Sequence, residues 1–479
     1  MSVTWRGTTY IQPQAATYTD TTGLATLGLA ASGVLAIIGT AEGGTPNAAT
    51  KYTSPAEARN DFRGGNLLVA MEAAWAEGAR TIYATRVGAT SGTAAAQPCQ
   101  QARYELTSSS TPVMRLTAID YGDWTNNIKF KIESGTTSGK KITLQYYNSS
   151  TGVTTTETQD NLADCNALCG WVSNNSSLCS GTVLSSYGSN EPDNVGYTNL
   201  ADGGDGDSPT TANWTTAIAL YDNEDVDIVH VASSSSTIHG LVSTHCTTTA
   251  TDKKERIGVV GGALSESVGS WDTDGSTIER AYSLNSDRMV LVAPGTTSGG
   301  TAYAPYVTAA RVAGALAAVD VATPLTHRKL SCTAIESKYT SSNKDDLITY
   351  GVCGIEQVTS GRRIIRGITT AQNISSTTEH PFKEISTRRI ADYVNKTIRD
   401  NLEATYVGKK GVEGIESSIA STTTSLLVKL KEQQIIVGFK DVVVSQDSTD
   451  ATVYYVTYKI APVQPINYVL IETKLSNTL

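Results

Sequence analysis

The sequence predicts an α/β core domain with an inserted β-rich module, a separate C-terminal α+β domain, and extended N- and C-terminal arms. Strand and helix patterns alternate in two separated stretches, short alternating segments interrupt them, and the last hundred residues are typical of two helices followed by strands. At 479 residues the chain is too long for one ordinary hydrophobic core. The expected boundaries are 1–22 for the N-terminal arm, 23–89 with 201–379 for the discontinuous core, 90–200 for the inserted module, 380–462 for the C-terminal domain and 463–479 for the C-terminal arm.

The core begins with a strand–helix–strand unit. An apolar run at 34–38 predicts a buried strand, and 81–87 predicts a second one. Between them a helix starts at about Asn66 and ends before Gly78, because glycine is favoured just after a helix. One face of this helix carries the apolar side chains Leu67, Leu68, Met71 and Trp75. Two strands joined through a helix are expected to lie parallel in one sheet, with the helix covering a face.

Between residues 90 and 200 the pattern changes to short alternating runs, such as 128–132 and 142–144, separated by Gly, Ser and Thr clusters. Such runs are typical of β-strands, so this stretch is predicted as an insertion rich in them. The α/β pattern then returns. It predicts helices at 213–221 and 305–319, the second rich in Ala and Gly, and strands at 226–231, 257–260 and 289–292.

The C-terminal domain is predicted from helical spacing that starts near His380. Apolar residues recur at Ile385, Ile390, Val394, Ile398 and Leu402. A second helix is expected at 415–430, followed by strands at 435–444, 453–460 and 466–475. Pro462 and Pro465 precede the last strand, and proline has no N–H for a sheet ladder. That strand is therefore expected to stand away from its own domain.

The charge of the chain is acidic and unevenly spread. Lys plus Arg is 37 and Asp plus Glu is 46, and a net charge of −9 offers no electrostatic surface for nucleic acid. Between residues 142 and 252 there are 13 acidic residues and no Lys or Arg. This stretch is either a solubilising surface or an outward face that meets a basic patch on a neighbouring copy. The apolar segment 23–39 is too short to span a bilayer, so no membrane or targeting segment is expected.

Seven cysteines in a chain of this length do not indicate a disulfide scaffold. Cys165, Cys169 and Cys179 form the one cluster, without a histidine and without the spacing of a common zinc site. Unpaired structural thiols are the favoured interpretation. Because the total is odd, the cluster also leaves room for a disulfide, including one to another molecule in an oxidising medium.

Other motifs that suggest chemistry are incomplete. The GTAEGG turn lacks the Lys-Ser/Thr ending of a phosphate-binding loop, so it is predicted to be a plain tight turn. Asp202, Asp205 and Asp207 lack the glutamate that completes a calcium loop and are predicted to form a turn that caps the next helix. His230, His239 and His245 match no metal-binding spacing and favour hydrogen-bonded structural roles in the core or at the surface. We therefore expect no enzyme activity, no cofactor and no metal.

Several blocks along the chain resemble the tail-sheath family of contractile-tailed phages and related contractile injection systems. The N-terminal block is GVLAIIGTAEGGTPNAATKYTSPAEARNDF, and the middle blocks include LADGGDGDSPTTANWTTAIALYDNEDVDIVHV and SLNSDRMVLVAPG. The C-terminal blocks are EISTRRIADYVNKTIRDNL, IIVGFKDVVV and YYVTYKIAPVQPINYVLIETKL. Their shared order covers most of the chain outside residues 90–200.

The resemblance implies a structural subunit that polymerises around an inner tail tube and contracts, driving the tube through the target cell envelope for viral genome delivery. In this family the terminal arms of each subunit add strands to a sheet in the C-terminal domains of neighbouring copies. Carried over, the arms are 2–19 and 463–475, and the receiving strands lie within 435–460. The candidate arm residues are Thr4, Tyr10, Val463, Ile466, Tyr468 and Leu470, and the candidate receiving residues are Ile436, Val443, Tyr455 and Tyr458.

The implied partners are other copies of the chain in a helical stack of rings, the inner tail tube protein, and baseplate and tail-terminator proteins. Neither nucleic acid nor membrane is an implied partner. The implied location is the virion tail after assembly in the host cytoplasm, with the C-terminal domain facing the tube and the insertion outside. Two alternatives stay open: a Ser/Thr-rich secreted surface or adhesin protein, and an enzyme on an α/β scaffold that uses His230, His239 or the Gly-rich turns.

Overall fold

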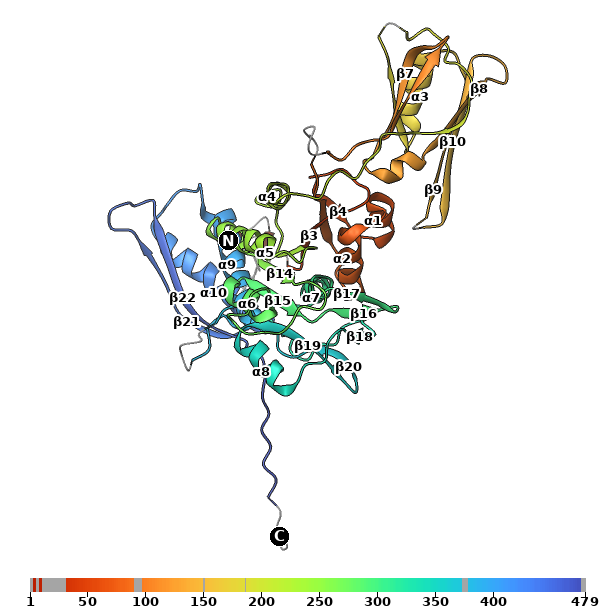
Figure 1. Ribbon diagram of the computed structural model, residues 1–479. Helices are drawn as coiled ribbons and strands as arrows, with labels where there is room; N and C mark the ends of the chain where they lie inside the picture. Colours follow the sequence, from red (N-terminus) through yellow and green to blue (C-terminus); the bar gives the residue numbers. More distant parts are fainter. Residues whose placement is uncertain are drawn as a thin grey trace.

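The structure is a computed structural model of mixed α/β architecture, and it describes residues 3–5, 8–10, 32–89, 97–149, 151–185, 187–372 and 378–474. Figure 1 shows a central sheet covered by helices, a β-rich lobe at one end, and a helix–strand region on the opposite side. Within the described residues no helix is both long and apolar enough to cross a membrane.

The described residues build an eight-stranded sheet at the centre of the molecule. In sheet order its strands are β20 (Gly361–Ile364), β19 (Val352–Val358), β15 (Met289–Ala293), β14 (Ile257–Gly261), β13 (Ile228–Val231), β3 (Leu35–Gly39), β5 (Ile82–Arg86) and β4 (Thr50–Tyr52). The inner strands are parallel, and the edge strands β20 and β4 are antiparallel. Parallel strands are buried on both faces, which explains their unbroken apolar runs. The predicted parallel pairing of the first unit is confirmed.

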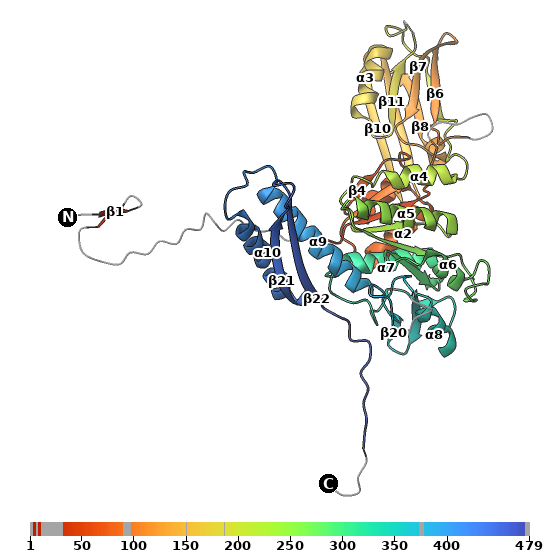
Figure 2. The same ribbon diagram turned by 90° about the vertical axis from the view of Figure 1, so that its left-hand side faces the viewer.

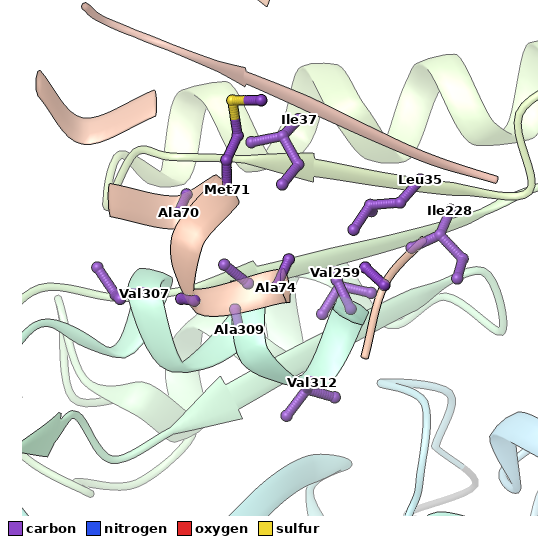
Figure 3. Packing of buried hydrophobic residues seen from close by; sticks show 14 of the residues in the cluster. Leu35, Ile37, Ala70, Met71, Ala74, Ile228, Val259, Val307, Ala309 and Val312 are labelled. Carbon is purple, nitrogen blue, oxygen red and sulfur yellow. The ribbon is translucent and has the colours of Figure 1, made fainter. Parts of the chain in front are cut away.

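Helices cover both faces of this sheet. One face carries α1 (Pro55–Phe62), α2 (Gly65–Ala76) and α7 (Pro305–Ala318), and the other carries α4 (Thr211–Ala219), α5 (Ser236–Thr251), α6 (Thr277–Leu284) and α8 (Ser341–Thr349). Figure 3 shows Met71 and Ala74 of α2 beside Val307 and Ala309 of α7. At Gly314 of α7 an added Cβ would lie 2.3 Å from the Ala74 carbonyl oxygen, so the two backbones can approach this closely only at a glycine. The predicted helices at 213–221 and 305–319 are confirmed.

The insertion forms two sheets around its own hydrophobic core. One sheet has the order β10 (Val153–Leu162), β9 (Lys140–Asn148), β8 (Lys129–Ser134) and β12 (Val195–Asn199). The other has the order β11 (Cys179–Val183), β7 (Thr111–Ala118) and β6 (Arg103–Ser108). A helix that the sequence patterns did not predict, α3 (Cys165–Asn175), packs against β11. The insertion also contains a short 3-10 helix (Asp123–Asn127). The core contains a second, small sheet of β17 (Thr301–Tyr303), β16 (Thr296–Ser298) and β18 (Ala334–Ile335).

A buried arginine at the end of β5 joins the insertion to the core. Arg86 is 1 % exposed, and its guanidinium donates hydrogen bonds to the carbonyl oxygens of Gly44 (3.0 Å) and Tyr121 (3.2 Å). It also donates to the Asp205 carboxylate at 3.2 Å. Tyr121 precedes β8 and Asp205 follows β12, so one side chain ties two segments on the insertion side to the core sheet.

The three aspartates of the DGGDGD segment belong to this junction, and the prediction that they cap the following helix is wrong. Thr210 caps α4 by accepting a hydrogen bond from the Asn213 backbone N–H. Asp205 pairs with Arg86, and the Asp207 carboxylate accepts from the Gln97 backbone N–H at 2.7 Å. Thr210 is a stronger N-cap than the aspartates, because a Thr with Asn three residues later forms a capping box.

The C-terminal region contains α9 (Ile385–Tyr406), α10 (Ile415–Glu432), β21 (Ile436–Gln446) and β22 (Tyr454–Pro462). Both predicted helices and the first two predicted strands are confirmed. The predicted strand at 466–475 is absent from the described residues, which end at 474 here, and this part of the chain runs without a strand partner. The hydrophobic core of the region consists of Val321, Ile390, Val394, Ile398, Leu426, Leu427, Leu430, Ile435 and Ile436.

Ion pairs attach α9 to the core of the protein. Arg288 donates two hydrogen bonds to the Asp392 carboxylate, at 2.9 and 3.1 Å. About two turns further along α9, Arg399 forms a similar two-pronged pair with Glu255, at 2.8 and 2.9 Å. These contacts are partly buried, so water and salt screen them less than they screen surface pairs. Ion pairs therefore strengthen the joint between α9 and the core, in addition to the apolar packing of Ile385 in the core cluster.

Replacing Arg86 with Met should lower the free energy of unfolding by about 3 kcal/mol, because the buried Gly44 carbonyl oxygen and two partly buried acceptors, on Tyr121 and Asp205, lose their donor. Chemical denaturation of the full chain measures the change. The matched control is Arg103→Met, which removes an exposed pair with Asp202 and should cost less than about 1 kcal/mol. Equal losses in the two variants would contradict the role given to Arg86.

The pair between Glu255 and Arg399 should make stability depend on acid. Burial alone raises the pKa of the Glu255 carboxyl, but the hydrogen bonds and charge of Arg399 outweigh it and hold the pKa below its ordinary value. Because the folded pKa is the lower one, the stabilisation is present above the ordinary glutamate pKa of about 4.3 and is lost as the pH falls through the folded value.

Glu255→Gln should therefore lower the melting temperature at neutral pH and reduce its decline in acid. The measurement is a series of melting temperatures between about pH 3 and 7. Glu57→Gln, at an exposed position on α1, serves as the control and should keep the wild-type profile. A wild-type profile for Glu255→Gln would show that the α9 joint does not depend on this pair.

Candidate subunit interface

The β21–β22 hairpin is a two-stranded sheet with both outer edges unpaired among the described residues. Its two faces differ. Phe439, Tyr458 and Ile460 pack against the core formed by α9 and α10, whereas Val443 and Tyr455 stand on the other face, 54 % and 52 % exposed. Two strands alone are marginally stable in water, so the helices hold this hairpin from one side. The outer edges and the second face remain open to another molecule.

The four candidate receiving residues lie in this sheet but not on one face. Ile436 is buried, and burial raises the pKa of the Tyr458 hydroxyl, whose ring packs on the inner side. Val443 and Tyr455 occupy the exposed side, on neighbouring strands. Strand pairing at an edge uses backbone groups and does not require side chains on one face. The inner face carries Ile436 and Tyr458, and the outer face carries Val443 and Tyr455.

Residues 463–474 leave this sheet as an extended segment. The Val463 N–H donates to the Ile435 carbonyl at 3.3 Å, and the Asn467 amide donates to the Glu384 carboxylate at 2.9 Å. These contacts hold the start of the segment beside the beginning of α9. Beyond them the chain extends away from the rest of the molecule, as Figure 2 shows.

The outer part of this segment is apolar and exposed. The large side chains are Ile466 (82 % exposed), Tyr468 (74 %), Val469 (75 %), Leu470 (94 %) and Ile471 (84 %). Isolated exposed apolar side chains are common, but a continuous run of them marks a surface that binds a partner. The candidate residues Ile466, Tyr468 and Leu470 therefore lie in a segment without a partner, while Val463 is packed at its base.

At the other end of the chain, β1 (Val3–Trp5) and β2 (Thr8–Tyr10) pair with each other as a small antiparallel hairpin. Thr4 and Tyr10 belong to these strands, and the rest of the predicted N-terminal arm lies outside the described residues. The structure does not bring this hairpin to the β21–β22 sheet, since the two form separate sheets.

The three clustered cysteines contribute to the hydrophobic core of the insertion. Cys165, Cys169 and Cys179 are buried, with free thiols, and no disulfide joins them to one another. Burial raises the pKa of these thiols to about 11, 12 and 12, respectively, which keeps them protonated and poorly reactive. The favoured interpretation of unpaired structural thiols agrees with this placement.

The histidines are also internal and have separate partners. The His230 ring lies 2.8 Å from the Val259 carbonyl oxygen, and burial lowers its pKa to about 4. His239 lies 2.9 Å from the Ser233 carbonyl oxygen, and burial lowers its pKa to about 3. Across the described ranges, no three His, Cys, Asp or Glu side chains are grouped so that they could hold a metal ion.

Comparisons with known proteins point to one family. A model of the phage tail sheath C-terminal domain matches residues 377–476, the region with α9, α10 and the β21–β22 sheet. The tail sheath protein of Bacillus phage SP01 is 34 % identical over 288 residues, which cover 58 % of this chain and 48 % of the relative. The chain thus spans about half the length of the curated relatives it matches.

Solved structures share the fold over nearly the whole chain. A sheath tail protein from Listeria innocua superimposes with a TM-score of 0.70 at 17 % identity, covering 91 % of this chain and 94 % of that one. The helical sheath of the anti-feeding prophage in its contracted state gives 0.56 at 12 % identity, covering 99 % and 100 %. The chain therefore matches the phage tail sheath C-terminal domain over its C-terminal region, is similar in sequence to phage tail sheath proteins, and shares the fold of solved sheath proteins.

Proposed function

We propose that this protein is the structural subunit of a contractile tail sheath, which polymerises around a tail tube and contracts to drive the tube through the target cell envelope. The proposal rests on one observation: the chain contains both parts of a strand-exchange contact. These are a sheet with open edges and an exposed apolar segment without a partner. Nothing among the relatives supports the alternative of a secreted adhesin, since those reported are sheath proteins.

The link between copies is proposed to be β-augmentation by the terminal arms. An arm strand laid along an edge of β21–β22 in a neighbouring copy would pair the backbone N–H and C=O groups that this edge leaves unpaired. The apolar side chains of 466–471 would leave water in the same step. The N-terminal arm, 2–19, is proposed to add a strand in the same way.

The domain arrangement is proposed to be the one expected from the sequence: a core of 23–89 and 201–379, an outer module of 90–200, and a C-terminal domain of 380–462 that faces the tube. Separate hydrophobic cores in the insertion and around α9 and α10 support this division. The family match to 377–476 supports the C-terminal boundary.

The proposed partners are further copies of the chain in a helical stack, the inner tail tube protein, and the baseplate and tail-terminator proteins. We propose no catalytic role, no cofactor, and neither nucleic acid nor membrane as a partner. The proposed place of action is the virion tail, assembled in the host cytoplasm. A relative with this fold forms a helical sheath in a contracted state, which supports a polymer that switches between two packings of one subunit.

Purified full-length chain should form striated hollow tubes under the electron microscope, and a chain ending at Pro462 should remain monomeric or form short rings. The truncation removes the apolar segment that has no partner within the chain. A chain ending at Lys474 keeps that segment and is the matched control. Normal tubes from the chain that ends at Pro462 would rule out the proposed C-terminal arm.

Side chains on opposite faces of the arm strand should differ in importance, because alternate residues of a strand point to opposite sides. Ile466→Ser with Tyr468→Ser should reduce tube yield more than tenfold, since burying each side chain contributes about 1.5–3 kcal/mol. Val469→Ser with Ile471→Ser changes the other face and should have a smaller effect. Sedimentation of tubes at matched concentrations gives the yields, and equal losses would contradict the strand register.

A further inference from the structure

We propose that bound water completes the joint between α9 and the core: Arg389 of α9 and Asp227, the residue before β13, hold each other through water molecules in a small cavity that both side chains line. The cavity lies between α9 and the residues just before three strands of the central sheet, β3, β13 and β14. This contact lies within one copy of the chain and does not depend on the proposed function.

Arg389 is a buried cation without a direct partner. The residue is 6 % exposed, and its Nη1 and Nη2 atoms have no hydrogen-bond partner in the described part of the chain. Burial lowers the pKa of the guanidinium to about 10, although the charges of Asp227 and Asp320 act in the opposite direction. The group therefore stays charged at neutral pH. Because buried charges are nearly always hydrogen-bonded, these two nitrogens point to a ligand in the cavity beside them.

Asp227 provides the opposite charge from the core side of the cavity. Its carboxylate accepts a hydrogen bond from the Val34 backbone N–H at 3.0 Å and lies 3.7 Å from the Lys396 ammonium group. Burial raises the pKa of this carboxyl group, and the Val34 hydrogen bond and the positive charges of Lys396 and Arg389 act against that rise. Asp320, the other carboxylate near Arg389, is exposed and does not line the cavity. Arg389 and Asp227 therefore attract each other without a direct hydrogen bond.

The size and the charge of the cavity favour water over an anion. Its volume is about 40 Å³, which is enough for about three water molecules at about 10–15 Å³ each. The charged side chains of the lining are balanced, with three that are basic and three that are acidic: Arg256, Arg389 and Lys396, and Asp227, Glu255 and Asp392. An anion would meet three carboxylates there, whereas water is neutral and both donates and accepts hydrogen bonds.

The other charged side chains of the lining already have direct partners. Asp392 and Glu255 bind arginine side chains, as described above, and Lys396 pairs with Asp225 as well as Asp227. Arg256 donates to the carbonyl oxygens of Tyr221 at 2.7 Å and Glu224 at 3.2 Å. Water molecules that accept from Arg389 and donate to Asp227 would therefore satisfy the donors that remain in this lining.

A water-mediated pair differs from a direct pair in how it depends on the donor. Water molecules can reorient around a changed cation, whereas a two-pronged arginine–carboxylate pair requires the planar guanidinium. The α9 joint contains both kinds of contact, since Arg399 binds Glu255 directly. Substitution of each arginine by lysine can therefore distinguish the two.

A double-mutant cycle in the full-length chain measures the coupling across the cavity. Arg389→Met, Asp227→Asn and their combination are compared with the wild type by chemical denaturation. If water joins the two charges, the loss in the combined variant should be smaller than the sum of the single losses. The difference should be at least about fivefold in the unfolding equilibrium constant. Additive losses, or an Arg389→Met variant as stable as the wild type, would show an isolated buried charge and overturn the proposal.

Lysine substitutions then separate water-mediated from direct pairing. Arg389→Lys should change the unfolding constant by less than about twofold, because water can follow the shorter ammonium group. The matched control is Arg399→Lys, which loses one bond of the direct pair with Glu255 and should change the constant at least about threefold. A loss at Arg389 as large as the loss at Arg399 would contradict the water bridge.

A crystal structure of the full-length chain grown in sodium bromide identifies the ligand directly. Water should give density within hydrogen-bond distance of Nη1 and Nη2 of Arg389, without an anomalous bromide signal. A bromide signal at this position would assign the cavity to an anion and overturn the proposal. Direct contact between Arg389 and Asp227, or a cavity without density, would overturn it as well.

Discussion

Backbone hydrogen bonding is the constraint on which this structure depends. Every strand has two rows of N–H and C=O groups, and a two-stranded sheet pairs only the inner rows. The outer rows of β21 and β22 therefore meet water in the single chain, as does the backbone of residues 468–474. Joining such an edge to such a segment satisfies both sets of groups and removes the apolar side chains of the segment from water. In the proposed contact, the backbone groups that one copy leaves unpaired would therefore stabilise its association with the next copy.

Two joints keep the remainder of the chain together while these edges stay open. Arg86 binds two segments of the insertion side to the core through the Tyr121 carbonyl oxygen and the Asp205 carboxylate, and α9 binds the core through Arg–carboxylate pairs. Both use the fixed geometry of guanidinium groups, which sets orientation more sharply than apolar packing does. In the proposed contractile polymer, stiff joints inside the subunit would leave movement to the contacts between subunits.

The proposed strand addition between copies relies on backbone hydrogen bonds and buried side chains, which respond little to salt. Such a link can stay closed while weaker contacts between copies change, as a switch between two packings of one subunit requires.

Local pattern was sufficient for the elements whose faces are strongly periodic. The run at 34–38, the apolar face of α2 and the helical spacing in α9 each specify burial by themselves, because a few neighbouring residues decide which side meets water. The same holds for the unpaired apolar segment, whose prolines already indicate that it leaves its sheet. This reasoning could not predict the burial of Arg86, its pairing with Asp205, or the partners of Asp392 and Glu255. The three ion pairs join residues more than a hundred positions apart, and only the folded arrangement of the core, the insertion and α9 decides which charge meets which.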